Sequence, residues 1–130
     1  MRYLSAEDIL VMHALVIDTT SGSHGVRDPH LLHSIAHKPQ TQFGGKQLYT
    51  DIFSKTAVLI EAIVNFHVFV DGNKRTALVS GARFLAINGY TLIATNKDAE
   101  HVILSLATKD MKVEQLVVWL KKNTRKSKAK

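Results

Sequence analysis

Residues 67–76 gather side chains that could carry chemistry into one uninterrupted stretch, His-Val-Phe-Val-Asp-Gly-Asn-Lys-Arg-Thr. A neutral histidine can act as a general base, a carboxylate can hold Mg²⁺, and cations beside a glycine turn can bind phosphate oxygens. An ordinary loop has little reason to concentrate these residue types between two apolar segments. Their joint occurrence therefore predicts a site that handles a nucleotide.

The second half of this stretch is expected to begin a helix. The first backbone N–H groups of a helix lack internal partners and bind anions, and Gly72 allows an oxygen to approach them. Asn73 lies at the same helix entry, and Lys74 and Arg75 would add charge-assisted donors to a polyphosphate. Asp71 would repel a bare phosphate, so its presence favours a Mg²⁺ ion that bridges the carboxylate to the phosphate oxygens.

His67 has a matching role ahead of the turn. A neutral imidazole near a bound phosphate can take the proton of an incoming hydroxyl, which predicts group transfer from a nucleotide to an alcohol. Phe69 is expected to be an apolar anchor that holds the loop. Each residue alone has a plainer interpretation: a packed histidine, a turn capped by Asp71 or Asn73, or cations on an exposed helical turn. Only their combination favours a functional site.

Two strongly apolar segments must position the stretch. Residues 51–66 are apolar nearly all round, which predicts a helix at the centre of the protein. Residues 73–88 predict a second buried helix, which Gly89 is expected to end. The backbone between these helices should be held by packing on both sides, as precise sites are.

Capping signals indicate where two further helices begin. Ser5 followed by Asp8 resembles a helix start, and apolar residues then recur at helical spacing. Asp28 with Pro29 behind it indicates the start of a shorter helix, which Pro39 should end.

The remaining segments complete a helical domain with a minor β element. Apolar periodicity predicts helices that include residues 99–106 and 113–120, after a short extended piece at 90–94. Residues 41–50 carry the pair Gly44–Gly45 between apolar residues, which favours a small exposed β-hairpin. The sequence thus predicts an all-α fold of about six helices with one small hairpin.

The composition fits an ordinary soluble domain. The chain has 130 residues, of which 45% are hydrophobic and 22% charged. The absence of cysteine excludes disulfides, thiolate metal sites and cysteine nucleophiles. The apolar run 9–17 is too short to cross a bilayer and contains His13, and Glu7 and Asp8 stand where a secretory signal would be basic. We therefore expect a cytoplasmic protein with no membrane contact.

The net charge of +6 is concentrated at one end of the chain. Without the last ten residues, the basic side chains only balance the 11 acidic ones. We expect a domain over residues 1–120 and a basic tail over 121–130, frayed and solubilising, with contact to RNA, DNA or an acidic partner as the alternative. The six cations of this tail are Lys121, Lys122, Arg125, Lys126, Lys128 and Lys130.

Residues 67–75 are similar to the signature of the Fic/Doc superfamily, His-x-Phe-x-(Asp/Glu)-(Gly/Ala)-Asn-(Gly/Lys)-Arg, at each specified position. The similarity extends upstream through residues 25–29 and 38–49, and downstream through 84–85 and 88–90. The resemblance implies the compact helical Fic fold. It also assigns roles to residues of the motif. The implied catalytic set is His67 as base, Asp71 as Mg²⁺ ligand and Arg75, and the implied phosphate-binding set is Gly72, Asn73, Lys74 and Arg75.

The residues at positions 74 and 78 resemble those of the death-on-curing (Doc) branch. Fic proteins that transfer AMP commonly have glycine where Lys74 stands and a second arginine where Leu78 stands. Lysine without the second arginine resembles Doc toxins, which are understood to bind the nucleotide in a reversed sense. The resemblance implies an ATP- and Mg²⁺-dependent protein kinase that transfers the γ-phosphate to a hydroxyl of elongation factor Tu and halts translation.

The hairpin segment matches the position of the family's flap, which holds a substrate backbone by β-strand addition. A mobile surface hairpin is the plainer interpretation of this segment. The residues expected to form the flap are Phe43, Gly44, Gly45, Lys46, Gln47 and Leu48.

The resemblance also implies how activity is restrained. Fic proteins carry an inhibitory Ser/Thr-x-x-x-Glu helix, but the residues four positions before Glu7, Glu61, Glu100 and Glu114 include neither Ser nor Thr. The Doc resemblance instead implies a separate antitoxin with a partly disordered segment, received by an apolar groove near the first helix. Nucleic acid would be reached only through that antitoxin.

Three other interpretations remain open. AMP transfer onto a protein hydroxyl is the alternative within enzymes. A catalytically inactive binding or regulatory module is the alternative outside the enzymes. The intact motif argues against a loss of catalytic activity. A metal-dependent nuclease is weaker, because His30, His33 and His37 share a helix face without matching carboxylates.

Overall fold

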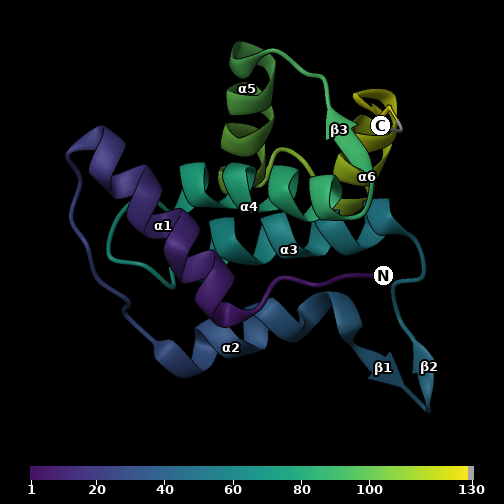
Figure 1. Cartoon of the computed structure of the whole chain (residues 1–130), viewed down its shortest axis with the longest axis horizontal. Helices are drawn as coiled ribbons and strands as arrows, with labels where there is room; N and C mark the ends of the chain where they lie inside the picture. The colour runs from purple at the N-terminus through teal and green to yellow at the C-terminus, as the bar shows by residue number, and fades with distance from the viewer. Residues whose placement is uncertain (129–130) are drawn as a thin grey trace.

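Two antiparallel helices, α3 (Ile52–Phe66) and α4 (Asn73–Ile87), form the centre of the computed structural model, which describes residues 1–128 (Figure 1). Helix α3 buries most of its circumference, as its sequence predicts. Close packing with α4 depends on Gly81, because a Cβ atom there would lie 2.5 Å from Cδ1 of Ile60. The two helices present their joined ends, and the loop between them, on one side of the molecule.

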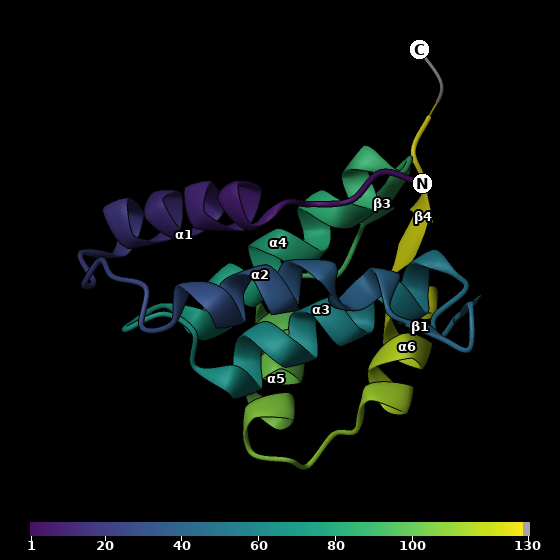
Figure 2. The same ribbon diagram turned by 90° about the horizontal axis from the view of Figure 1, so that it is seen from below.

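Four more helices surround this pair within the described residues. Helix α1 (Ala6–Thr20) packs against α4, and α2 (Pro29–His37) packs against α1 and α3. On the other side, α5 (Asn96–Ala107) and α6 (Val113–Lys122) pack against the central pair (Figure 2). This arrangement confirms the predicted all-α fold. None of the helices in residues 1–128 has both the length and the apolar character needed to cross a membrane.

The helix starts follow the predicted capping signals. Ser5 forms a capping box with Asp8 at the start of α1. The side chain of Asp28 accepts a hydrogen bond from the backbone N–H of Leu31, and Pro29 is the first residue of α2. Pro39 lies in a short 3₁₀ turn, η1 (Lys38–Gln40), directly after that helix.

The predicted hairpin is present as strands β1 (Gln42–Phe43) and β2 (Lys46–Gln47). A second antiparallel pair is formed by β3 (Tyr90–Leu92) and β4 (Thr124–Lys126). The sequence predicts the extended piece that contains β3, but it does not predict β4. The expectation of a frayed tail is wrong for residues 121–122, which end helix α6, and for strand β4. Backbone hydrogen bonds hold this strand in place, and its polar side chains carry no apolar alternation that would reveal it. Lys130, the last cation of the expected tail, lies outside the described residues.

Candidate active site

His67 ends helix α3 in an unusual backbone conformation. Its φ and ψ angles of 50° and 45° place it in the left-handed region, where residues other than glycine are uncommon. The side chain is exposed, as expected for a base that must reach a substrate. Strained backbone of this kind costs on the order of 1 kcal/mol and is concentrated at functional sites.

The loop after His67 is anchored in the core by Phe69, which is fully buried. The ring of Phe69 stacks on the ring of His13, with 3.8 Å between centroids and 5° between planes. Backbone hydrogen bonds join this loop to the segment before α2: Arg27 N–H donates to Val68, and Val70 N–H donates to Gly25. The predicted role of Phe69 as an anchor is confirmed.

Helix α4 begins at a glycine rather than at a capping side chain. Its N-cap is Gly72, with φ of 77°, and no side chain caps the first turn. Gly72 also fits closely under α1, since a Cβ atom would lie 2.9 Å from Cδ1 of Ile17. The plainer interpretation, in which Asp71 or Asn73 caps the helix, is therefore wrong. An N-terminus without a side-chain cap can offer N–H groups to an anion.

The side chain of Asn73 forms hydrogen bonds with the loop and does not cap helix α4. Its Oδ1 accepts a hydrogen bond from the Phe69 N–H at 3.0 Å, and its Nδ2 donates to the Phe69 carbonyl at 2.9 Å. The side chain thus shapes the turn from within. Its contact with phosphate remains a prediction, for which the second N–H of the amide is still available.

The carboxylate of Asp71 is exposed but held at both oxygens. Oδ1 accepts the Gly72 N–H at 2.8 Å, and Oδ2 accepts the Ser23 N–H at 3.1 Å. Each oxygen keeps a further lone pair for a cation. Gly22 leaves room for this arrangement, because a Cβ atom there would lie 2.7 Å from Oδ2. Sequence reasoning missed Gly22 and Ser23, which approach Asp71 only through the fold.

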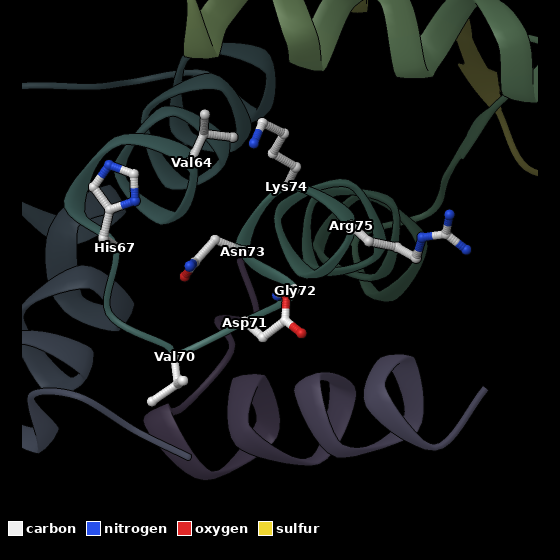
Figure 3. Close-up of a pocket in the computed structure, with 8 residues that line it drawn as sticks. All are labelled: Val64, His67, Val70, Asp71, Gly72, Asn73, Lys74 and Arg75. Carbon is white, nitrogen blue, oxygen red and sulfur yellow. Dashed lines mark hydrogen bonds between the residues drawn. The ribbon is translucent and has the colours of Figure 1, made fainter. Parts of the chain in front are cut away.

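The motif side chains meet around one open hollow of about 320 Å³. Figure 3 shows His67 and Asp71 toward opposite ends of the loop, with Asn73 between them and Arg75 extending away from His67. The structure therefore brings together every motif residue predicted for the site. The residues that line the hollow are Val64, His67, Val70, Asp71, Gly72, Asn73, Lys74 and Arg75.

The two cations of the hollow are available to bind an anion. Lys74 and Arg75 are exposed, and within residues 1–128 the single close contact between a basic and an acidic side chain joins His24 to Asp18. Neither cation is therefore neutralised by a carboxylate in the described part of the chain. The Lys74 ammonium lies on the His67 side of α4 and the Arg75 guanidinium on the far side (Figure 3), so Lys74 and the N-terminus of α4 supply the positive charge on the His67 side of the hollow.

The hairpin lies away from this hollow. Its residues are exposed, and both views place it at the end of α3 remote from the motif loop (Figures 1 and 2). It is tied to the first turn of α3, where Lys55 donates a 2.8 Å hydrogen bond to Oε1 of Gln47. From Lys55 to His67 the helix rises about 18 Å. A substrate held by the hairpin would need about five or six extended residues to reach His67.

The chemistry of the hollow fits a Mg²⁺ ion that arrives with a nucleotide. Asp71 is its one carboxylate, and no cluster of three or more metal-ligating side chains occurs within residues 1–128. Mg²⁺ is commonly held by one or two carboxylates together with phosphates and water, so a single aspartate suffices. His30, His33 and His37 are exposed and form no such cluster, so nothing in the described chain favours the nuclease interpretation.

Asp51, the N-cap of α3, is an ionisable group whose surroundings shift its pKa. Partial burial raises the pKa of Asp51, but hydrogen bonds from the N–H and hydroxyl of Ser54 and from the N–H of Phe53 more than offset this. The pKa therefore lies below the ordinary value of an aspartate. The group stabilises the start of α3 and is remote in sequence from the motif.

Comparison with known proteins agrees with the geometry. The model of the Fic/DOC family matches residues 3–85. The chain is 34% identical over 121 residues to "Toxin Doc" of Mycolicibacterium smegmatis, which covers 92% of this chain and 91% of that protein. It is 30% identical over 122 residues to "Protein kinase doc" of Escherichia phage P1, which covers 94% and 95% of the two chains. The chain therefore belongs to the Fic/DOC family, within its death-on-curing branch.

Proposed function

We propose that this protein is the toxin of a toxin–antitoxin pair and acts in the cytoplasm as an ATP- and Mg²⁺-dependent protein kinase. It would transfer the γ-phosphate to a Ser or Thr hydroxyl, with elongation factor Tu as the target. The observation that carries the proposal is the shared hollow, in which an exposed histidine, a carboxylate and two unpaired cations line the start of α4. The names of the two relatives, a Doc toxin and a doc protein kinase, support it.

Each side chain then has a task in the transfer. Lys74, Arg75 and the first N–H groups of α4 bind the phosphates and hold the γ-phosphorus in place. Asp71 would hold Mg²⁺, which neutralises charge on the phosphate oxygens when bound. His67 takes the proton of the substrate hydroxyl as its oxygen bonds to the γ-phosphorus. The bond from this phosphorus to the β,γ-bridging oxygen breaks, and ADP leaves.

Residue 74 favours γ-phosphate transfer over AMP transfer. Lys74 places a side chain where AMP-transferring relatives have glycine, and its ammonium group supplies a charge at the helix start. Leu78, on the next turn of α4, supplies no second cation for distal phosphates. The site thus offers its positive charge at one place, the first turn of α4, which suits the phosphoryl group that is transferred.

The restraining partner would bind a groove between α1 and α4. This groove has a volume of about 480 Å³, and Val11 and Leu15 on its rim are 60% and 59% exposed. Exposed apolar side chains of this kind favour an amphipathic helix as the partner. We propose that a segment of a separate antitoxin folds into the groove, with Arg2 and Arg83 facing its acidic residues.

Labelled ATP separates the proposed reaction from its alternatives. The protein is incubated with Mg²⁺ and a bacterial lysate, using ATP labelled at either the α- or the γ-phosphate. Label that enters a protein only from the γ-position, and only when the parent rather than a His67→Ala variant is added, supports the kinase, whereas label from the α-position that shows the same dependence indicates AMP transfer. If neither label enters protein, and a His67→Ala variant inhibits growth as strongly as the parent, the chain is a binding module instead.

A further inference from the structure

His13 is a buried histidine that the proposed transfer does not use. It lies on the inner face of α1 and is 2% exposed. Its ring stacks on Phe69, and its Nε2 lies 2.8 Å from the backbone oxygen of Asp71. A side chain 58 residues away in sequence thus contacts the peptide group of the metal-binding candidate.

The contact fixes the form of the histidine. A carbonyl oxygen can only accept a hydrogen bond, so Nε2 must carry the proton and donate it. The stacked Phe69 ring holds the imidazole in one plane, which aims this N–H at the Asp71 oxygen. Buried donors and acceptors are costly to leave unpaired, so the two groups restrain each other.

The loop after helix α1 holds the carboxylate of Asp71. Ser23 N–H donates to Oδ2 of Asp71, and Gly22 provides the space that this oxygen occupies. With the bond from Gly72 N–H to Oδ1, three hydrogen bonds fix Asp71 at its carbonyl and at both carboxylate oxygens. Two of the three come from residues 13–23, outside the motif.

We propose that His13 is a positioning residue for Asp71, acting through the peptide oxygen to set the direction of the carboxylate. The inference rests on the proposed function, in which Asp71 holds Mg²⁺ against the nucleotide. Sites of this kind need their groups held to within about 0.5 Å, by neighbours that are themselves fixed by packing. His13 meets that description, because its ring is buried, stacked and hydrogen bonded.

Two substitutions separate the donor from the ring. His13→Phe keeps an aromatic ring on Phe69 but removes the N–H, and His13→Gln removes the ring but keeps an amide donor. The Mg²⁺ concentration needed for half-maximal transfer should rise about 10- to 100-fold in His13→Phe, as for other residues that orient a metal ligand. His13→Gln should recover part of this loss. His33→Phe, on the exposed face of α2, is the matched control and should match the parent.

Gly22→Ala tests the same geometry without touching His13. The new Cβ would displace the Asp71 carboxylate, and it should raise the Mg²⁺ requirement as His13→Phe does. An unchanged Mg²⁺ requirement in folded His13→Phe, or equal losses in His13→Phe and His13→Gln, would overturn the proposal. If His13→Phe fails to fold, His13→Leu, which also lacks the N–H donor, replaces it in this assay and in the exchange measurement below.

A readout without catalysis keeps the inference separate from the proposed function. Amide hydrogen exchange reports the bonds that Gly72 and Ser23 donate to Asp71. His13→Phe should speed exchange at these two amides while the interior of α3 keeps its protection. Equal acceleration throughout the chain, or none at Gly72 and Ser23, would contradict the positioning role. If the parent transfers nothing but these amides respond, the proposed function fails and the coupling of His13 to Asp71 stands.

Discussion

Asn73 closes on the backbone of Phe69 from both sides: its Oδ1 accepts the Phe69 N–H at 3.0 Å and its Nδ2 donates to the Phe69 carbonyl at 2.9 Å. This double hydrogen bond ties the first residue of α4 to the buried anchor of the loop. The loop between His67 and Gly72 is therefore a fixed element rather than a mobile connection. Its rigidity sets the relative positions of the proposed base and the proposed metal ligand.

Substitution of Asn73 should loosen the loop before it affects nucleotide affinity. Asn73→Ala removes both hydrogen bonds, and we expect the free energy of unfolding to fall by about 1–3 kcal/mol, with transfer lost. Asn73→Asp keeps the acceptor and should retain more stability than Asn73→Ala. Urea unfolding combined with a transfer assay checks this. A fully stable Asn73→Ala variant with a raised KM for ATP alone would show that the residue only contacts phosphate.

His67 should show opposite effects on stability and activity. Because His67 has a positive φ, His67→Gly should stabilise the fold by up to about 1 kcal/mol while transfer is lost. His67→Ala should also abolish transfer and leave the fold intact, since the side chain is exposed. Thermal unfolding and a γ-phosphate transfer assay test both variants. Unfolding of His67→Ala would point to a structural role instead.

Arg75 should act mainly on nucleotide use. Arg75→Ala removes one of the two unpaired cations at the start of α4, and we expect weaker ATP binding and slower transfer with unchanged stability. Arg83→Ala, an exposed arginine further along the same helix, is the matched control. Steady-state kinetics with varied ATP measure the effect. Identical kinetics in Arg75→Ala and the parent would remove this residue from the site.

Lys55 should hold the hairpin against helix α3. Lys55 is 1% exposed, and its ammonium group donates to the Pro39 carbonyl at 2.9 Å and to Oε1 of Gln47 at 2.8 Å. Lys55→Met should release the hairpin from α3 and speed trypsin cleavage after Lys46. Lys97 is an exposed residue of α5, and Lys97→Met should leave cleavage unchanged. A cleavage rate equal to that of the parent would show that backbone pairing alone holds the hairpin.

The Asp51 cap should make stability depend on pH. The pKa of Asp51 is lowered in the folded state, so its contribution is present above the ordinary value of 3.8 and is lost as pH falls through the lower, folded value. The stability difference between the parent and Asp51→Asn should therefore shrink as the pH falls below 3.8. Urea unfolding at pH 6 and at progressively lower pH measures it. A difference that grows on acidification would contradict the lowered pKa.

Local signals explain why so much of the fold could be predicted. Helix starts depend on residues three positions apart, as at Ser5 and Asp28, so the sequence alone reveals them. Strand β4 escaped prediction because its stability comes from backbone pairing with β3, a segment more than thirty residues earlier. Its polar residues show none of the alternation of a half-buried strand.

The same difference between local and long-range signals decides which residues of the site could be predicted. The motif residues are contiguous, so the hollow they share could be predicted, whereas His13 and Ser23 lie 58 and 48 residues from Asp71. A lone histidine in an apolar helix carries no local sign of its partner. The use of Asn73 to hold Phe69, rather than to cap α4, likewise depends on the tertiary course of the loop.

The most direct test of the account is the intact mass of elongation factor Tu after incubation with the purified protein, Mg²⁺ and ATP. A parallel reaction with His67→Ala provides the control. We predict that the factor gains the mass of one phosphate with the parent protein and gains nothing with the variant. A gain of one AMP, or a factor whose mass is unchanged by the parent protein, would contradict the proposed kinase activity toward this target.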